Sequence, residues 1–161
     1  MIVQIRCATI EDAPLVHSII QAAFAEYDGA LPVPPGALAE TVEEAARAIG
    51  EGTTMLAYDG AEAVGTVRYE VRPDYVYLGR LAVLPSHRGQ GVGAALMAHV
   101  ERLAPGLGRS KVHLGTRLSM PSNLAFYERL GYRVVLTEPH PRGDDTNVWF
   151  EKELGTPVDN T

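Results

Sequence analysis

The stretch from Leu81 to Leu96 constrains the fold more than any other part of this chain, because an apolar strand pattern runs through a glycine-rich turn into an apolar helix pattern. Glycines at positions 89, 91 and 93 remove the Cβ atoms that would keep an anion away from the backbone. The helix predicted from Val92 adds unpaired N–H groups and the positive end of its dipole. We therefore expect this turn to hold a phosphate or diphosphate, with Arg88 adding positive charge at its rim.

Other meanings of such a turn fit the sequence less well. Gly89-x-Gly91-x-x-Ala94 formally satisfies the dinucleotide fingerprint, but it lies in mid-chain and lacks the acid that would bind a ribose about twenty residues later. A P-loop requires Gly-Lys-Ser/Thr, whereas Gly93 is followed by two alanines, so P-loop nucleotide hydrolysis is excluded. A purely structural strand–helix turn is the third alternative, but it does not require three alternating glycines beside an arginine.

The rest of the chain predicts short strands and helices in the order βααβββαβαββ. Strand patterns cover residues 2–6, 53–58, 63–71, 75–84, 111–116, 132–137 and 147–154, and helical patterns cover residues 9–24, 38–50, 92–103 and 122–130. The last two helices are expected to cross over between strands that lie parallel, in a mixed α/β sheet. We expect a single domain over residues 1–154 and a frayed tail over residues 155–161.

Composition narrows the class of protein. With 161 residues, 46% of them hydrophobic, the chain can bury one sizeable core, and it has no apolar run long enough to cross a bilayer. Its net charge is −6, with nine acids against two arginines in the first 60 residues, so it offers no basic footprint for nucleic acid. Cys7 is the only cysteine, and no metal-ligand spacing is present. We expect a cytoplasmic protein with no metal and no nucleic-acid or membrane partner.

Two motifs, in the right order, resemble those of the GNAT superfamily of acyl-CoA-dependent N-acyltransferases. Residues 88–93, Arg-Gly-Gln-Gly-Val-Gly, resemble the family pattern Arg/Gln-x-x-Gly-x-Gly/Ala and follow a typical strand, Arg-Leu-Ala-Val. Residues 123–132, Asn-Leu-Ala-Phe-Tyr-Glu-Arg-Leu-Gly-Tyr, resemble the second family motif. The resemblance covers essentially residues 2–153. It implies a mostly antiparallel central sheet of about seven strands, splayed between two parallel strands and flanked by about four helices, with acetyl-CoA as co-substrate.

The resemblance also implies roles for individual residues. The CoA diphosphate would rest on backbone N–H groups of the glycine turn, and the preceding strand would bind the pantetheine arm and hold the thioester carbonyl. The implied cofactor-binding residues are Leu81, Ala82, Val83, Arg88, Gly89, Gln90, Gly91, Val92, Gly93, Ala94, Asn123 and Tyr127. Tyr127 stands where the family usually places the general acid for the departing thiolate. Packing of its ring above Gly131 is the alternative role.

The general base is less clear from the sequence. An aliphatic amine with a pKa of about 10.4 is protonated at pH 7, and deprotonating it costs roughly 4 to 5 kcal/mol. Many relatives carry a glutamate on the strand before the glycine turn, but residues 75–84 contain no acid. Glu70 and His113, on neighbouring strands, remain candidates as catalytic bases, acting directly or through water; each could equally be a bystander.

The acceptor is expected to meet the connection between the first two helices, where Glu26 and Tyr27 would suit a cationic amine. This predicts acetyl transfer to the primary amine of a small molecule, by direct attack in a ternary complex. Acetylation of a protein lysine or N-terminus remains an alternative, as does a non-catalytic acyl-CoA sensor. A homodimer is also possible, since relatives often form dimers.

Overall fold

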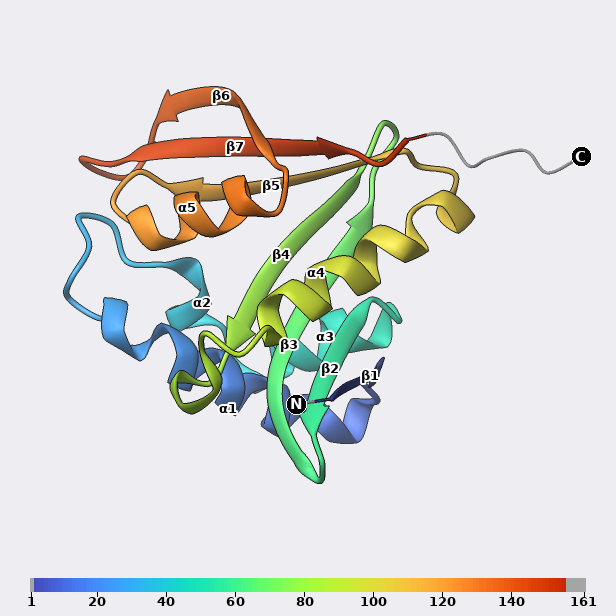
Figure 1. Ribbon diagram of the computed structural model, residues 1–161. Helices are drawn as coiled ribbons and strands as arrows, with labels where there is room; N and C mark the ends of the chain where they lie inside the picture. Colours follow the sequence, from blue (N-terminus) through green and yellow to red (C-terminus); the bar gives the residue numbers. More distant parts are fainter. Residues whose placement is uncertain (1, 156–161) are drawn as a thin grey trace, which may run out of the picture.

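The structure, a computed structural model, describes residues 2–155, so all of the predicted tail except Gly155 lies outside the described residues. Its centre is a seven-stranded sheet in the order β1-β2-β3-β4-β5-β7-β6 (Figure 1). The strands are β1 (Val3–Cys7), β2 (Thr54–Asp59), β3 (Glu62–Val71), β4 (Val76–Val83), β5 (Lys111–Arg117), β6 (Arg133–Pro139) and β7 (Thr146–Glu153). All neighbouring strands run antiparallel except β4 and β5, which confirms the predicted mixed, mostly antiparallel sheet.

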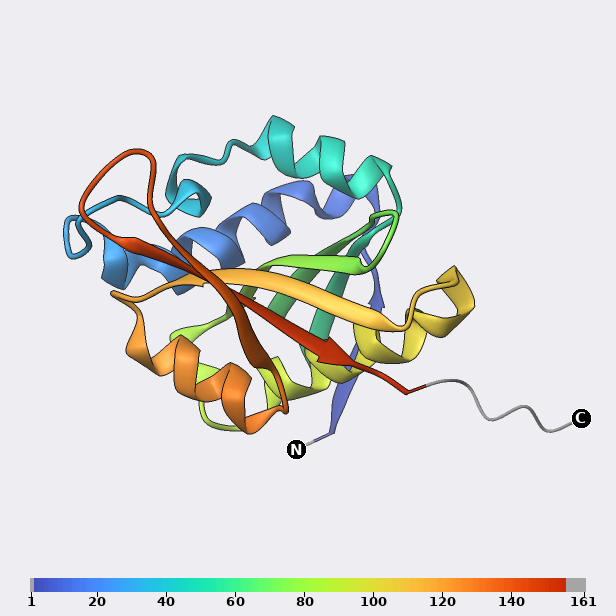
Figure 2. The same ribbon diagram turned by 90° about the horizontal axis from the view of Figure 1, so that it is seen from above.

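Helices cover both faces of the sheet. They are α1 (Ala13–Phe24), α2 (Gly36–Ala39), α3 (Val42–Gly50), α4 (Val92–Leu103) and α5 (Pro121–Arg129), with 3₁₀ turns at Ile10–Asp12, Ala25–Tyr27, Pro85–His87 and Pro105–Leu107. Figure 2 shows α1 and α3 on one face and α4 and α5 on the other. Within residues 2–155, each helix is too short or too polar to span a bilayer.

Local sequence signals explain where several elements begin and end. Gly60 takes a positive φ of 59° in the turn that joins β2 to β3, at the predicted Asp59-Gly60 hairpin. The helix predicted over residues 38–50 is divided in two, because the Thr41 side chain accepts a hydrogen bond from the Glu44 N–H (3.1 Å) and starts α3 afresh. Pro121 opens α5, and Gly131 follows its end with a φ of 92°.

The core forms two layers, one on each face of the sheet. Beneath α4 and α5, the largest buried side chains include Leu96, Met97 and Phe150. On the other face, Ile19 and Ile20 of α1 are buried in a cluster that includes Leu56 of β2 and Ala82 of β4. Burying a large aliphatic or aromatic side chain contributes about 1.5–3 kcal/mol, so these layers hold the sheet in a fixed shape.

The parallel strands β4 and β5 separate soon after they pair. They are in register only at Val76–Val112 and Tyr77–His113, although β4 continues to Val83 and β5 to Arg117. Beyond these pairs the facing backbone N–H and C=O groups have no strand partner. The predicted splay between two parallel strands is therefore confirmed.

A bulge in β4 lies beside the splay. Thr66 of β3 faces Ala82 and Arg68 faces Gly79, so Val67 alone stands opposite both Arg80 and Leu81. Arg80 has a φ of 52° and is the one residue other than glycine with a positive φ in the described chain. Bulges turn a side chain away from its regular direction, and this one lies at the mouth of the splay.

Candidate active site

Two cavities meet where the strands separate. One, of about 550 Å³, lies between the glycine turn, the end of α1 and α5. The other, of about 460 Å³, lies against β3, β4, β5 and β7. Four residues line both cavities: Phe24, Leu81, Met120 and Asn123. A long ligand in the first cavity can therefore present its end to a small ligand in the second.

The glycine turn leaves open space above its backbone. Gly89 and Gly91 have φ values of 74° and 87°, and a Cβ added at either position would meet no atom within 4 Å. Gly91 caps α4, so the first N–H groups of that helix face this space without intrahelical acceptors. At Gly93 the requirement for glycine is steric, because an added Cβ would lie 3.2 Å from the Phe126 ring. The turn thus combines an open anion cradle with close packing of α4 on α5.

The Arg88 side chain does not stand free at the rim of the turn. Its guanidinium donates to a Glu26 carboxylate oxygen at 2.5 Å and to the Ala23 carbonyl oxygen at 2.6 Å, which ties the turn to the end of α1. Glu26 and Tyr27 line the same cavity as Arg88 rather than the second cavity. This placement does not support an amine-binding role for the Glu26 carboxylate, because Arg88 already neutralises it.

Most of the remaining residues predicted to bind the cofactor line the first cavity. They are Leu81, Ala82, Val83, Val92, Ala94 and the three glycines of the turn. Gln90 is not among the lining residues, and its side-chain amide donates to the Ser86 carbonyl oxygen at 3.3 Å.

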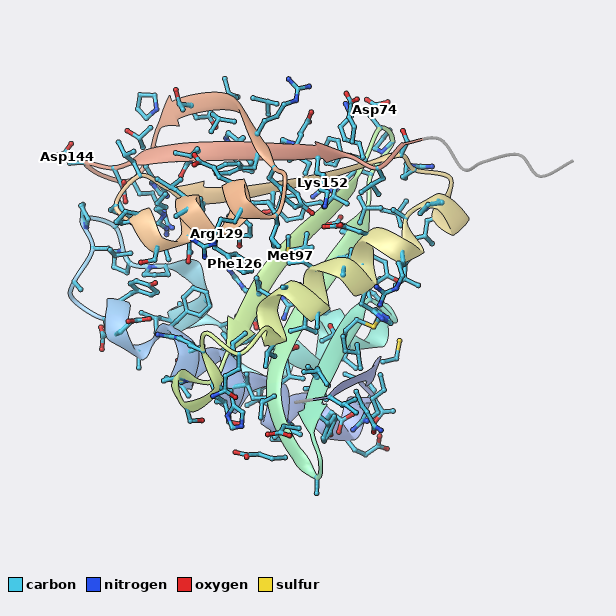
Figure 3. All side chains as sticks on the ribbon, in the orientation of Figure 1. Asp74, Met97, Phe126, Arg129, Asp144 and Lys152 are labelled. Atoms are coloured by element: carbon cyan, nitrogen blue, oxygen red, sulfur yellow. The ribbon has the colours of Figure 1, made fainter. Side chains whose placement is uncertain are left out.

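Arg129 is a lining residue that sequence reasoning missed. It lies in the last turn of α5 and lines the first cavity (Figure 3). No ion pair of its guanidinium is found among residues 2–155. A basic residue at a helix end is usually explained by the helix dipole, so its position in the sequence does not point to a ligand. In the structure, Arg129 contributes positive charge to the lining of the first cavity.

Asn123 and Tyr127 lie one turn apart on α5 and reach the junction of the cavities. The Asn123 amide donates weakly to Thr116 Oγ1 at 3.4 Å. The Tyr127 ring is packed in the core, with centroids 5.3 Å from Phe126 and 5.8 Å from Phe150. Its hydroxyl has no hydrogen-bond partner in the described part of the chain, and the residue lines the second cavity. The ring therefore packs while the hydroxyl remains available to a ligand.

Burial raises the pKa of Tyr127 well above its usual value, and the nearby Tyr77 and Tyr27 add to this effect. The phenol is consequently protonated throughout the neutral and mildly alkaline range. A protonated hydroxyl beside an emerging thiolate can donate a hydrogen bond and then a proton.

The two candidate bases lie in different surroundings. Glu70 lines the second cavity, is 55% exposed and pairs with Arg72 at 3.1 Å. His113 lines neither cavity. Its Nδ1 atom lies 2.9 Å from the Glu151 carboxylate, and its ring stacks between Tyr75 and Trp149. The structure thus brings Glu70, but not His113, to the same cavity as Tyr127.

A buried ion cluster forms one wall of the second cavity. Glu40 is 3% exposed and accepts two hydrogen bonds from Arg68, at 2.8 and 3.0 Å, and one from Arg80 Nε at 3.3 Å. Burial alone would raise the pKa of Glu40, but Arg68 and Arg80 outweigh burial and leave this pKa lowered. Glu40 is therefore ionised at neutral pH. Across residues 2–155, no three His, Cys, Asp or Glu side chains group in a way that could hold a metal ion.

Comparisons with known proteins agree with this arrangement. Residues 16–132 match the model of the acetyltransferase (GNAT) family. A Bacillus subtilis protein named uncharacterized N-acetyltransferase YjcF is 35% identical over 85 residues, which is 53% of this chain and 59% of that protein, so the match spans less than two thirds of the relative.

Solved structures show the same fold. The ribosomal-protein-S18-alanine N-acetyltransferase from Escherichia coli superposes with a TM-score of 0.78 at 21% identity and covers 99% of each chain. The PaiA N-acetyltransferase from Thermoplasma acidophilum, in complex with coenzyme A, superposes with a TM-score of 0.79 at 16% identity. The match covers 95% of this chain and 99% of the PaiA chain. Because the family model matches well over half of the sequence, this chain belongs to the GNAT acetyltransferase family.

Proposed function

We propose that this protein transfers an acetyl group from acetyl-CoA to the primary amine of a small molecule, by direct attack in a ternary complex. The observation that carries the proposal is the meeting of two cavities at Leu81 and Asn123, one beside an open glycine turn and one beside a tyrosine hydroxyl. A solved structure of the same fold holds coenzyme A, which supports the assignment of the first cavity.

In this proposal the diphosphate of acetyl-CoA binds the backbone N–H groups between Gly89 and Ala94. The open space above Gly89 and Gly91 admits its oxygens, and Arg129 adds positive charge. Arg88, through Glu26 and the end of α1, holds the turn in position rather than donating its charge to the ligand.

The pantetheine arm then runs along the unpaired edge of β4. Backbone groups near Leu81 and Ala82 would bind it as an added strand and hold the thioester carbonyl oxygen while negative charge develops there. Asn123, whose present bond to Thr116 is long, is free to reorient toward the arm.

Acyl transfer moves two protons. The amine nitrogen forms a bond to the acetyl carbon, the carbon–sulfur bond breaks, and the sulfur leaves with the electron pair. Tyr127 gives its proton to that sulfur, and Glu70 accepts the amine proton through water. That proton then returns through water to the Tyr127 phenolate, which restores both groups. We assign the base to Glu70 rather than His113 because only Glu70 lines the acceptor cavity.

The size of the second cavity supports a small acceptor. Its volume of about 460 Å³ lies in the range of small-molecule sites. A protein acceptor would instead have to bring a lysine or an N-terminus into this cavity on a chain segment.

The test is thiol release from acetyl-CoA in the presence of small amines, amino acids and lysine- or N-terminus-bearing peptides. We expect turnover with at least one small amine, and a hundredfold or greater loss of that turnover in Tyr127→Phe. Heat of coenzyme A binding without thiol release from any acceptor would show a sensor instead. Turnover with peptides alone would overturn the small-molecule assignment.

A further inference from the structure

The ion cluster in the acceptor cavity has more cationic hydrogen-bond donors than acceptors. The single carboxylate of Glu40 forms ion pairs with two guanidinium groups, those of Arg68 and Arg80. Each guanidinium carries five N–H donors, and only three hydrogen bonds to Glu40 are formed. Arg68 Nε is also buried with no partner among the described residues. The cluster therefore carries a net positive charge and lacks one acceptor group.

Arg80 is the member of this cluster that remains open to a ligand. Only its Nε atom is engaged, and within residues 2–155 its two terminal nitrogens have no acceptor. A Cβ placed on Gly36 would lie 3.5 Å from one terminal nitrogen and 3.8 Å from the other, so the guanidinium rests against a residue with no side chain. The Arg80 side chain is 36% exposed and lines the cavity. Two parallel N–H groups of this kind match a carboxylate.

The backbone of β4 holds Arg80 in an uncommon conformation. Its φ of 52° lies in the left-handed region, which a long side chain rarely adopts. Such strain persists only where the surrounding structure imposes it, and it is concentrated at ligand-binding positions. Here the bulge opposite Val67 and the bond to Glu40 impose it together.

The other charged groups that line this cavity are already engaged or lie at its exposed rim. Arg117 donates from its terminal nitrogens to the carbonyl oxygens of Val33 and Pro34. Glu70 pairs with Arg72, and both Glu51 and His140 belong to the cavity lining without contacting the cluster. Arg80 is therefore the cation in this cavity best placed to bind an incoming anion.

We propose that the acceptor amine carries a carboxylate, which binds the terminal nitrogens of Arg80. The inference rests on the proposed function, because it names the acceptor of the same site. Arg80 lines the second cavity and directly precedes Leu81, which lines both cavities. In this proposal one small molecule therefore carries both the carboxylate that binds Arg80 and the amine that reaches the thioester, as an amino acid does.

The experiment compares amino acids with their own carboxamides as acceptors, using thiol release from acetyl-CoA. We expect wild-type kcat/KM to favour the carboxylate at least tenfold for the best acceptor. Arg80→Gln should abolish this preference, mainly through a higher KM for the amino acid and with little change in the KM for acetyl-CoA. Arg80→Gly should do the same. Glycine relieves the positive-φ strain that Arg80→Gln keeps, so agreement between the two variants would point to the lost guanidinium rather than to the backbone.

Arg133→Gln serves as the matched control, since Arg133 is 69% exposed on β6, outside both cavities, and pairs with Glu153. The Arg133→Gln variant should keep the wild-type preference for the amino acid over its carboxamide. Equal use of amino acid and carboxamide by the wild type would overturn the carboxylate assignment while leaving the proposed acetyl transfer intact, as would a preference that survives both Arg80 variants. Absence of thiol release with every acceptor would instead refute the proposed function, and this inference with it.

Discussion

The cavity proposed for the cofactor and the cavity proposed for the acceptor are built in opposite ways. Half of the first is lined by one continuous segment, residues 81–94, and the groups proposed to bind the diphosphate are backbone N–H groups at the start of α4. The second is built from β3, β4, β5, β7 and the α2 region, and its charge comes from side chains such as Arg68 and Arg80. A site made of contiguous backbone tolerates many side chains around it. A site made of distant side chains can change its ligand with one substitution.

The largest effect should follow from placing a carboxylate in the cofactor cavity. Gly91→Glu adds negative charge where the diphosphate binds and removes several charge-assisted hydrogen bonds, each worth about 1.5–3 kcal/mol. We expect coenzyme A affinity to fall on the order of 10³-fold in calorimetry. Gly108→Glu is the control, because Gly108 has a similar φ of 76° and equally open surroundings, outside both cavities. Equal losses in both variants would contradict the special role of the glycine turn.

A smaller effect, on chemistry alone, is expected at the junction of the cavities. Tyr127→Phe keeps the packed ring and removes a hydroxyl that has no hydrogen-bond partner in residues 2–155, so folding stability and acetyl-CoA affinity should not change. The turnover number should fall about 10²-fold, the lower range for loss of a general acid. Because the pKa of Tyr127 is raised, this group should contribute no alkaline limb to the pH–rate profile below about pH 10.

Tyr132→Phe is the matched control for that variant. It removes the hydrogen bond from the Tyr132 hydroxyl to Glu101, at 3.0 Å, and should cost about 1 kcal/mol of stability without slowing turnover. A Tyr127→Phe enzyme as fast as the wild type would assign Tyr127 to packing alone.

In the ion cluster beside the proposed acceptor cavity, Glu40→Gln should mainly lower the free energy of unfolding. It leaves Arg68 and Arg80 without their carboxylate, and we expect a loss of about 2 kcal/mol, below the range for fully buried pairs because both arginines are partly exposed. The pKa of Glu40 is lowered in the folded state, so its contribution is complete above the unfolded value of about 4.3 and is lost as pH falls through the lower folded value. The free energies of unfolding of the two proteins, measured with denaturant, should therefore differ at pH 7 and converge as pH falls through the lowered pKa of Glu40. A difference that is independent of pH would contradict ionic stabilisation.

The smallest effect is expected for the base. Glu70→Gln should lower kcat/KM roughly tenfold, because water can still accept the amine proton. His113→Gln should leave kcat/KM unchanged, since His113 lies outside the cavities. The reverse result would move the base to His113.

The sequence predicts the first cavity better than the second for a physical reason. Alternating glycines before an apolar helix are a local signal, and so is the Asp59-Gly60 hairpin, and the structure contains both. The order of strands and helices also agrees with the prediction, apart from one additional helix before β2. The splay of β4 from β5 was implied by family resemblance and is confirmed. The division of residues 38–50 into α2 and α3 was missed, because helical spacing continues through the capping residue Thr41.

Long-range pairing explains what the sequence could not predict. Glu40 meets Arg68 and Arg80 only because a loop after α1 folds over a bulge in β4, and neither feature has a local signature. For the same reason Glu26, which lies near an aromatic in the sequence and suggested an amine site, is found against Arg88. Side-chain sites assembled from separate strands require the register of the sheet to be known.

The most direct measurement is a calorimetric titration of the folded protein with coenzyme A and, separately, with pantetheine, which lacks the nucleotide and diphosphate. If the glycine turn binds the diphosphate through the first N–H groups of α4, coenzyme A should bind at least a hundredfold more tightly than pantetheine, and Gly91→Glu should bring the two affinities together. Equal affinities in the wild type, or a difference that Gly91→Glu leaves unchanged, would contradict this account.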